Sequence, residues 1–284
     1  MNMFLQLSLR LGICVGIIAF FAEYVDSTLG MGYGTALTPI LLLLGFDPLE
    51  VVPVILLSEF ITGITAGFTH HSMGNVNFKL KTMSIKKIVR SFKRLGIVES
   101  IRRGIPLHLR VVLLIASCSI IGTIGAVFVA VNIPKFYLKL YIGILILIIG
   151  IVILLTVKKE YGFSWKKITF LGLIASFNKG ISGGGYGPVV TGGQLISGID
   201  GKNAIGITSM AEGLTCLVGV VTYFIMKKEI SWRLAPYLVI GALLSVPLSA
   251  YTVKKLQTKV LRIVIGFITM GLGILTVAKI VLSL

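Results

Sequence analysis

The hydrophobic positions of this chain fall in runs of about 20 residues, the length that an α-helix needs to cross a lipid bilayer. Runs such as 111–131 carry no polar face at helical spacing, which separates them from the amphipathic helices of soluble proteins. The pattern predicts ten apolar segments, five in each half of the chain. They lie near residues 4–25, 34–45, 49–69, 109–131, 136–157, 163–180, 186–198, 203–226, 232–252 and 260–282.

The pattern indicates an all-α polytopic membrane protein made of two homologous halves, a first repeat over residues 1–157 and a second over 158–284. In each half about four segments are long enough to cross the membrane. The remaining segment, near 34–45 and 186–198, is short and led by glycines, so we expect a broken or re-entrant helix there. A composition of 56% hydrophobic and 13% charged residues agrees with this class.

The repeat aligns without a gap over its most polar part. Residues 26–62 match residues 179–215 at an offset of 153, with nine identities in 37 positions. Later helices correspond at an offset of 123, because a basic loop near 72–106 is inserted in the first half alone. The identical pairs are Gly30/Gly183, Gly32/Gly185, Tyr33/Tyr186, Gly34/Gly187, Thr38/Thr191, Gly45/Gly198, Asp47/Asp200, Glu59/Glu212 and Thr62/Thr215.

The relative orientation of the halves depends on the short segments. If these return to the side from which they enter, each half has four crossings and the halves are parallel; if they complete the crossing, each half has five and the halves are inverted. The Lys and Arg residues on the later connections nearly cancel between the two arrangements. We favour inverted repeats, because broken helices at a pseudo-two-fold interface recur in transporters.

The net charge of +17 is concentrated, since ten of the 27 Lys and Arg residues lie between Lys79 and Arg110. Within this stretch, residues 84–95 alternate apolar and basic positions at helical spacing, which is typical of a helix lying on anionic lipid. A positive cytoplasmic loop that sets topology is the alternative, and the two are compatible. So apolar a chain offers little surface for nucleic acid, which we exclude as a partner.

The two glycine clusters are candidate substrate-binding turns. Each glycine costs about 1 kcal/mol relative to alanine inside a helix, so we expect unwound backbone at mid-membrane followed by a helix N-terminus. Exposed N–H groups and the helix dipole would then bind an anion, and a side chain at 184 or 185 would block its approach. Close helix packing is the alternative. The candidate residues are Gly30, Gly32, Tyr33, Gly34, Gly183, Gly184, Gly185, Tyr186 and Gly187.

Charged residues accompany both clusters. Asn178 and Lys179 precede the second cluster, and the residue of the first repeat that aligns with Lys179 is Asp26. The lysine therefore either holds an anion or pairs with Asp26. Glu59 and Glu212 follow their clusters at equal distance, either as a proton or cation relay or as caps of broken-helix N–H groups. We expect the two glutamates to differ, with Glu212 at the site. Roles for Glu23, His70 and His71 stay open.

Other chemistry is not indicated. The cysteines Cys14, Cys118 and Cys216 occur singly in apolar runs, without the spacing of a metal site or disulfide pair. Walker, HExxH and Ser-His-Asp patterns do not occur either. We therefore expect no catalytic residue, metal or cofactor, and no enzyme activity.

The clusters Gly30-Met-Gly-Tyr-Gly-Thr and Ser182-Gly-Gly-Gly-Tyr-Gly-Pro, each followed by Gly-Phe-Asp-Pro or Gly-Ile-Asp-Gly-Lys-Asn, resemble the sulfite exporter TauE/SafE family, also called the toluenesulfonate uptake permeases. The resemblance covers most of the chain outside the basic loop. It implies a secondary transporter in the cytoplasmic membrane, an exporter of a small anion such as sulfite or an organosulfonate. An anion channel and a membrane enzyme or assembly factor are the alternatives, and a homo-oligomer is left open.

Overall fold

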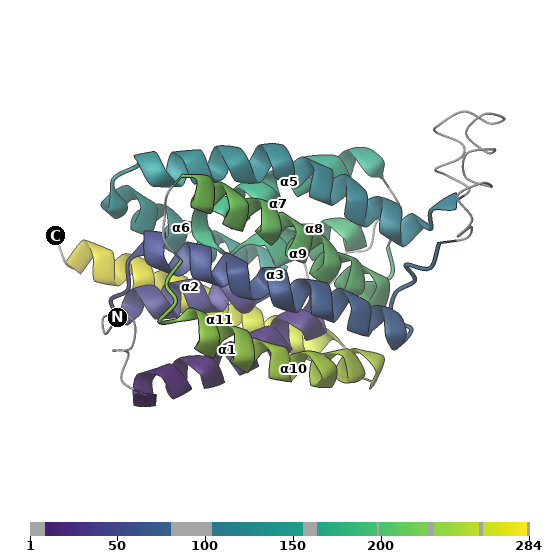
Figure 1. Ribbon diagram of the computed structural model, residues 1–284, viewed down its shortest axis with the longest axis horizontal. Coiled ribbons are helices and arrows are strands. Elements are labelled where there is room, and N and C mark those ends of the chain that lie inside the picture. The colour runs from purple at the N-terminus through teal and green to yellow at the C-terminus, as the bar shows by residue number, and fades with distance from the viewer. Residues whose placement is uncertain are drawn as a thin grey trace.

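The computed structural model describes residues 9–80, 104–155, 164–197, 199–226, 230–255 and 258–282. Every regular element in these ranges is an α-helix, as predicted (Figure 1). The expected surface helix at 84–95 lies outside the described residues. The helices are α1 (Leu9–Leu29), α2 (Tyr33–Leu43), α3 (Pro48–Ser72), α5 (Leu107–Asn132), α6 (Lys135–Leu155), α7 (Trp165–Ser182), α8 (Tyr186–Ile196), α9 (Gly201–Ile225), α10 (Ala235–Lys255) and α11 (Thr258–Leu282).

The protein is a multi-pass membrane protein. Among the described helices, α3, α5, α9 and α10 are each long and apolar enough to cross a bilayer. Large apolar side chains such as Ile121 and Phe224 are exposed on the outside of the bundle, each with 74% of its surface accessible. Exposure on this scale is typical of a surface that faces lipid rather than water.

The helices pack side by side in the order α7, α5, α9, α3, α10 and α1, with α6 and α11 packed along each other. Their axes run roughly along the horizontal direction of Figure 1, and α3 and α9 lie in the middle. Both central helices begin at an aspartate. Asp47 precedes Pro48 at the first helical position, and the Asp200 carboxylate accepts the Lys202 N–H at 3.2 Å.

The central helices α3 and α9 run antiparallel. At the left end of the bundle in Figure 1, Ser231 in the connection after α9 donates to Glu50 in the first turn of α3 at 2.8 Å. At the right end, Asn75 in the connection after α3 donates to the Ala250 carbonyl at 2.9 Å. Lys202 in the first turn of α9 bonds to the Lys254 carbonyl there. The connections that follow α3 and α9 therefore lie at opposite ends.

Helices α1 and α2 form a hairpin that returns to the left end. Gly12 near the start of α1 lies against Tyr237 at the start of α10. The end of α2 lies at the same end, since Leu43 accepts a hydrogen bond from Lys279 and Asp47 pairs with Lys135 at 2.9 Å. The sequence expectation linked a returning short helix to parallel halves. In the structure the short helix α2 does return, yet α3 and α9 run antiparallel. The reason is that α1 and α2 together begin and end at the same end of the bundle, so the pair adds no crossing of the membrane.

Candidate functional site

Two glycine turns interrupt the helices at the centre of the bundle, as predicted. Gly30 and Gly32 between α1 and α2 have φ of 68° and 141°. Gly183 and Gly185 between α7 and α8 have φ of 71° and 75°. These values lie in the left-handed region that residues with a Cβ rarely adopt, so glycine is what allows the chain to unwind at these points.

The two turns pack directly against each other. A Cβ atom on Gly34 would overlap the carbonyl oxygen of Gly183, and one on Gly187 would overlap the carbonyl oxygen of Gly30. A Cβ atom on Gly184 would lie 2.9 Å from the Gly34 carbonyl carbon. The backbone of each turn fills the space in front of the other, so close packing accounts for these glycines.

Several N–H groups of the turns are hydrogen-bonded within the protein. Tyr33 N–H donates to Asp26 Oδ1 at 3.1 Å, and Gly34 N–H donates to Glu59 Oε1 at 3.2 Å. In the second turn, Gly185 N–H donates to Thr35 Oγ1 at 3.0 Å. Glu59 therefore caps the broken helix, one of the two roles left open by the sequence. These three N–H groups are therefore already bonded within the protein.

A buried ion-pair cluster joins α3, α7 and α9 beside the turns. The Lys179 ammonium pairs with Glu59 Oε2 and lies 2.6 Å from Glu212 Oε1. All three side chains are at most 4% exposed. Lys179 thus pairs with the two glutamates rather than with Asp26. The cluster lies near the middle of α3 and α9, where an ionised group without a partner is costly.

The two glutamates are not equivalent. Glu59 accepts hydrogen bonds from Gly34 N–H and, at 3.7 Å, from the thiol of Cys216, and it pairs with Lys179. Glu212 contacts Lys179 through Oε1, whereas its Oε2 atom has no hydrogen-bond partner among the described residues although it is buried. A buried carboxylate oxygen without a donor is unusual in a folded protein.

Two further acids adjoin the cluster from α1. Asp26 is 6% and Glu23 2% exposed, and Glu23 accepts a hydrogen bond from Thr62 at 3.1 Å. Both lie close enough to Glu59 and Glu212 to interact electrostatically. Among the described residues, Lys179 is the single buried Lys or Arg beside four buried acids. The site therefore has more acidic groups than one lysine can neutralise.

The remaining predicted residues line the surroundings of the cluster. Tyr33 and Tyr186 are fully buried, and their hydroxyl groups bond to Ser58 at 2.7 Å and to Thr215 at 3.2 Å. Asn178 accepts a hydrogen bond from the Tyr141 hydroxyl of α6 at 2.9 Å. The structure thus places the turns, the lysine and the carboxylates close together.

Cys216 is the site residue that sequence reasoning missed. It lies four positions after Glu212 on α9, a spacing that places two residues on the same helix face. That spacing could have indicated that the thiol faces the cluster. No group of three or more His, Cys, Asp or Glu side chains among the described residues is arranged to hold a metal ion.

His70 and His71 lie near the right-hand end of α3, away from the cluster. His71 Nδ1 lies 3.1 Å from the Val76 carbonyl oxygen, in the turn after the helix. His70 is buried and bonds to Ser27 and to Asn75. Both histidines therefore hold the end of α3.

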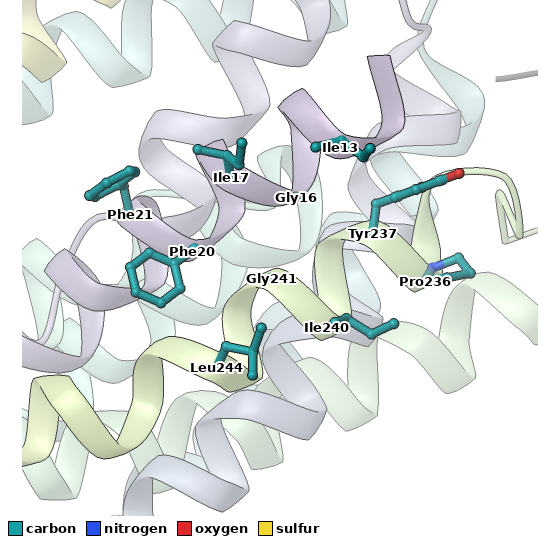
Figure 2. Close-up of a pocket in the computed structure, with 10 residues that line it drawn as sticks. All are labelled: Ile13, Gly16, Ile17, Phe20, Phe21, Pro236, Tyr237, Ile240, Gly241 and Leu244. Atoms are coloured by element: carbon teal, nitrogen blue, oxygen red, sulfur yellow. The ribbon is translucent and has the colours of Figure 1, made fainter. Parts of the chain in front are cut away.

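A separate cavity of about 640 Å³ lies between α1 and α10 on the outside of the bundle (Figure 2). Its lining is almost wholly apolar, and Phe21, Ile240 and Leu244 from it are more than half exposed. It contains no charged side chain, so it offers nothing to an anion.

An apolar helical bundle with a charged cluster buried at its centre defines a membrane protein with a polar site inside the bilayer. The profile of the sulfite exporter TauE/SafE family matches residues 15–92 and 85–276 of the chain. The chain belongs to this family of membrane transporters and is not an enzyme. A protein of Bacillus subtilis (strain 168), "Probable membrane transporter protein YtnM", is 24% identical over 261 residues, covering 88% of this chain and 77% of that protein. No solved structure matches the chain.

Proposed function

We propose that this protein is a secondary transporter that exports a small anion, a sulfur oxyanion such as sulfite or an organosulfonate, across the cytoplasmic membrane. The observation that carries the proposal is Lys179, a cation buried at mid-membrane where the two glycine turns meet. A desolvated ammonium group is the natural countercharge for an anion that leaves water. A negative charge leaving an inside-negative cell gains about 2.3 kcal/mol per 100 mV, which favours export.

A carrier fits the structure better than a channel. Lys179, Glu59 and Glu212 are closed off from solvent, and the glycine turns are in close backbone contact beside them. Substrate would reach Lys179 only when helices move, which is the alternating access of secondary transporters. The unwound turns are where such movement costs least, because they lack continuous helical hydrogen bonds.

We further propose that the halves are inverted repeats, the first over 1–157 and the second over 158–284. Corresponding helices have matching bounds: α2 and α8 begin and end 153 positions apart, as do α3 and α9. The packing is also reciprocal, since α1 packs on α10 while its counterpart α7 packs on α5. The antiparallel course of α3 and α9 supports inversion rather than a parallel arrangement.

The right end of the bundle in Figure 1 is proposed to face the cytoplasm. The helix ends and connections of the described ranges at this end carry Lys79, Arg110, Lys166, Lys167, Lys202, Lys254, Lys255, Lys259 and Arg262. Both ends of the basic insertion attach at this end, and residues 81–103 add eight more Lys and Arg to the connection. Short cytoplasmic loops are rich in these residues. In this orientation, the same connection would meet anionic lipid.

The test is flux in proteoliposomes that contain the purified protein. Efflux of sulfite, thiosulfate, methanesulfonate and chloride would be compared with efflux from protein-free vesicles. We expect saturable efflux of at least one sulfur anion, and accelerated exchange when the same anion is present outside. Counterflow of this kind identifies a carrier, whereas flux that never saturates would identify a channel. Equal leakage of all four anions from vesicles with and without protein would refute the proposal.

A further inference from the structure

We propose that the substrate anion and Glu212 compete for the Lys179 ammonium, so that an anion binds only together with a proton that neutralises Glu212. The inference rests on the proposed transport function and adds the coupling ion and its acceptor. Glu212 acts in the empty protein as an internal substitute for the substrate.

First, the charge of Lys179 is already compensated within the protein. Its ammonium contacts Glu59 and Glu212 at once, and it is 1% exposed. No other Lys or Arg side chain is buried in the described part of the chain. An anion that needs a cation at this depth must therefore take the place of one of the two carboxylates.

The second step identifies Glu212 as the group that leaves. Glu59 is held by three partners, Lys179, the N–H of Gly34 and the thiol of Cys216. Glu212 is held by Lys179 alone through Oε1, and its Oε2 atom has no partner among the described side chains. Removing Glu212 from the lysine breaks one contact, whereas removing Glu59 would also uncap the broken helix.

The third step is that a displaced Glu212 must take up a proton. It would otherwise be a bare carboxylate in a region that already contains other acids and has no second cation to offer. The titratable groups close enough to interact with it are Glu23 and Asp26 from α1, Glu59 from α3, Lys179 from α7, Tyr186 from α8, and Cys216 from α9 itself.

The step balances in charge. A monoanion pairs with Lys179, one proton from water binds the released Glu212 carboxylate, and the charge of the buried cluster does not change. A monoanion would then move without net charge, so its export is driven by its own gradient rather than by the membrane potential, and a pH gradient that is acidic outside works against it. A dianion would carry one negative charge and would still respond to the membrane potential.

Binding to purified protein in detergent tests this directly. Thiosulfate and methanesulfonate serve as probes, because neither titrates near neutral pH. We expect uptake of about one proton per anion bound, reported by a pH indicator in weak buffer. We also expect the dissociation constant to rise about tenfold per pH unit on the alkaline side, as one linked proton requires. Binding to the parent protein without proton uptake would overturn the inference.

Three variants sharpen the test. Glu212→Gln should bind the probes with an affinity that no longer changes with pH, since nothing has to be protonated. Glu59→Gln should keep the tenfold slope, and so should Glu50→Gln, a control on the same helix outside the cluster. A slope that persists in Glu212→Gln, or is lost in Glu59→Gln, would overturn the assignment. If neither probe binds or moves with the parent protein, the proposed function itself fails.

Discussion

His70 and Tyr223 make the same hydrogen bond in the two halves of the molecule. His70 Nε2 lies 2.9 Å from the Ser27 carbonyl oxygen, and the Tyr223 hydroxyl donates to the Gly180 carbonyl oxygen at 3.0 Å. The two donors are 153 positions apart, and so are the two acceptors. Each bond joins the end of a long central helix to the helix that precedes a glycine turn. Different side chains thus hold the two turns in corresponding places, which supports the proposed repeat.

Tyr223→Phe should lower the free energy of unfolding by about 1–3 kcal/mol, because the buried Gly180 carbonyl loses a donor that water cannot replace. Thermal unfolding in detergent measures the change. Tyr137→Phe, at a tyrosine that is 60% exposed, is the matched control and should leave the melting temperature unaltered. Equal melting temperatures for Tyr223→Phe and the parent would mean that the hydroxyl bond does not hold the turn.

Gly34→Ala should reduce the yield of folded protein, because its Cβ atom would overlap the backbone of the opposite turn. Gly125→Ala is the control, since a Cβ atom on Gly125 in α5 meets nothing within 4 Å. Fluorescence-detected size-exclusion chromatography of both variants compares their monodisperse fractions. We expect a severalfold loss for Gly34→Ala and none for Gly125→Ala. Parent-like yield from Gly34→Ala would show that the turns are not in the contact described.

The bilayer orientation can be tested with single cysteines in a background without Cys14, Cys118 and Cys216. Trp232→Cys, at a position 61% exposed in the connection after α9, should react with an impermeant maleimide added to intact cells. Lys79→Cys, at the other end, should react only after permeabilisation, because the basic end faces the cytoplasm. The reverse labelling pattern would invert the proposed orientation, and labelling of both from outside would contradict the antiparallel course of α3 and α9.

The sequence predicts the helices and both turns but not the contacts of the site. Runs of apolar residues and glycines are local signals, so the bounds of α3 and the positive φ of Gly183 follow from them. The partner of Lys179 depends on how far α7 is displaced along α3 and α9, which no local pattern encodes. For that reason the sequence suggested an anion or Asp26 as the partner of Lys179 and did not suggest the glutamates, and the contact of Cys216 with Glu59 was missed.

Replacement of the lysine itself gives the sharpest test of the cluster. Lys179→Met leaves Glu59 and Glu212 facing each other without a cation, and removal of one member of a buried ion pair costs about 3–5 kcal/mol. We expect little folded protein from this variant. Lys166→Met, which removes an exposed lysine from the start of the same helix, should behave as the parent.

The triple variant Lys179→Met, Glu59→Gln and Glu212→Gln removes the lysine together with the charges that it compensates. We expect its thermal stability to return to within about 1–2 kcal/mol of the parent, because neutral polar groups remain where ions were paired. It should nevertheless bind no thiosulfate or methanesulfonate, since the countercharge is gone. A stable triple variant that still binds these anions would show that Lys179 holds the fold together but does not receive the substrate.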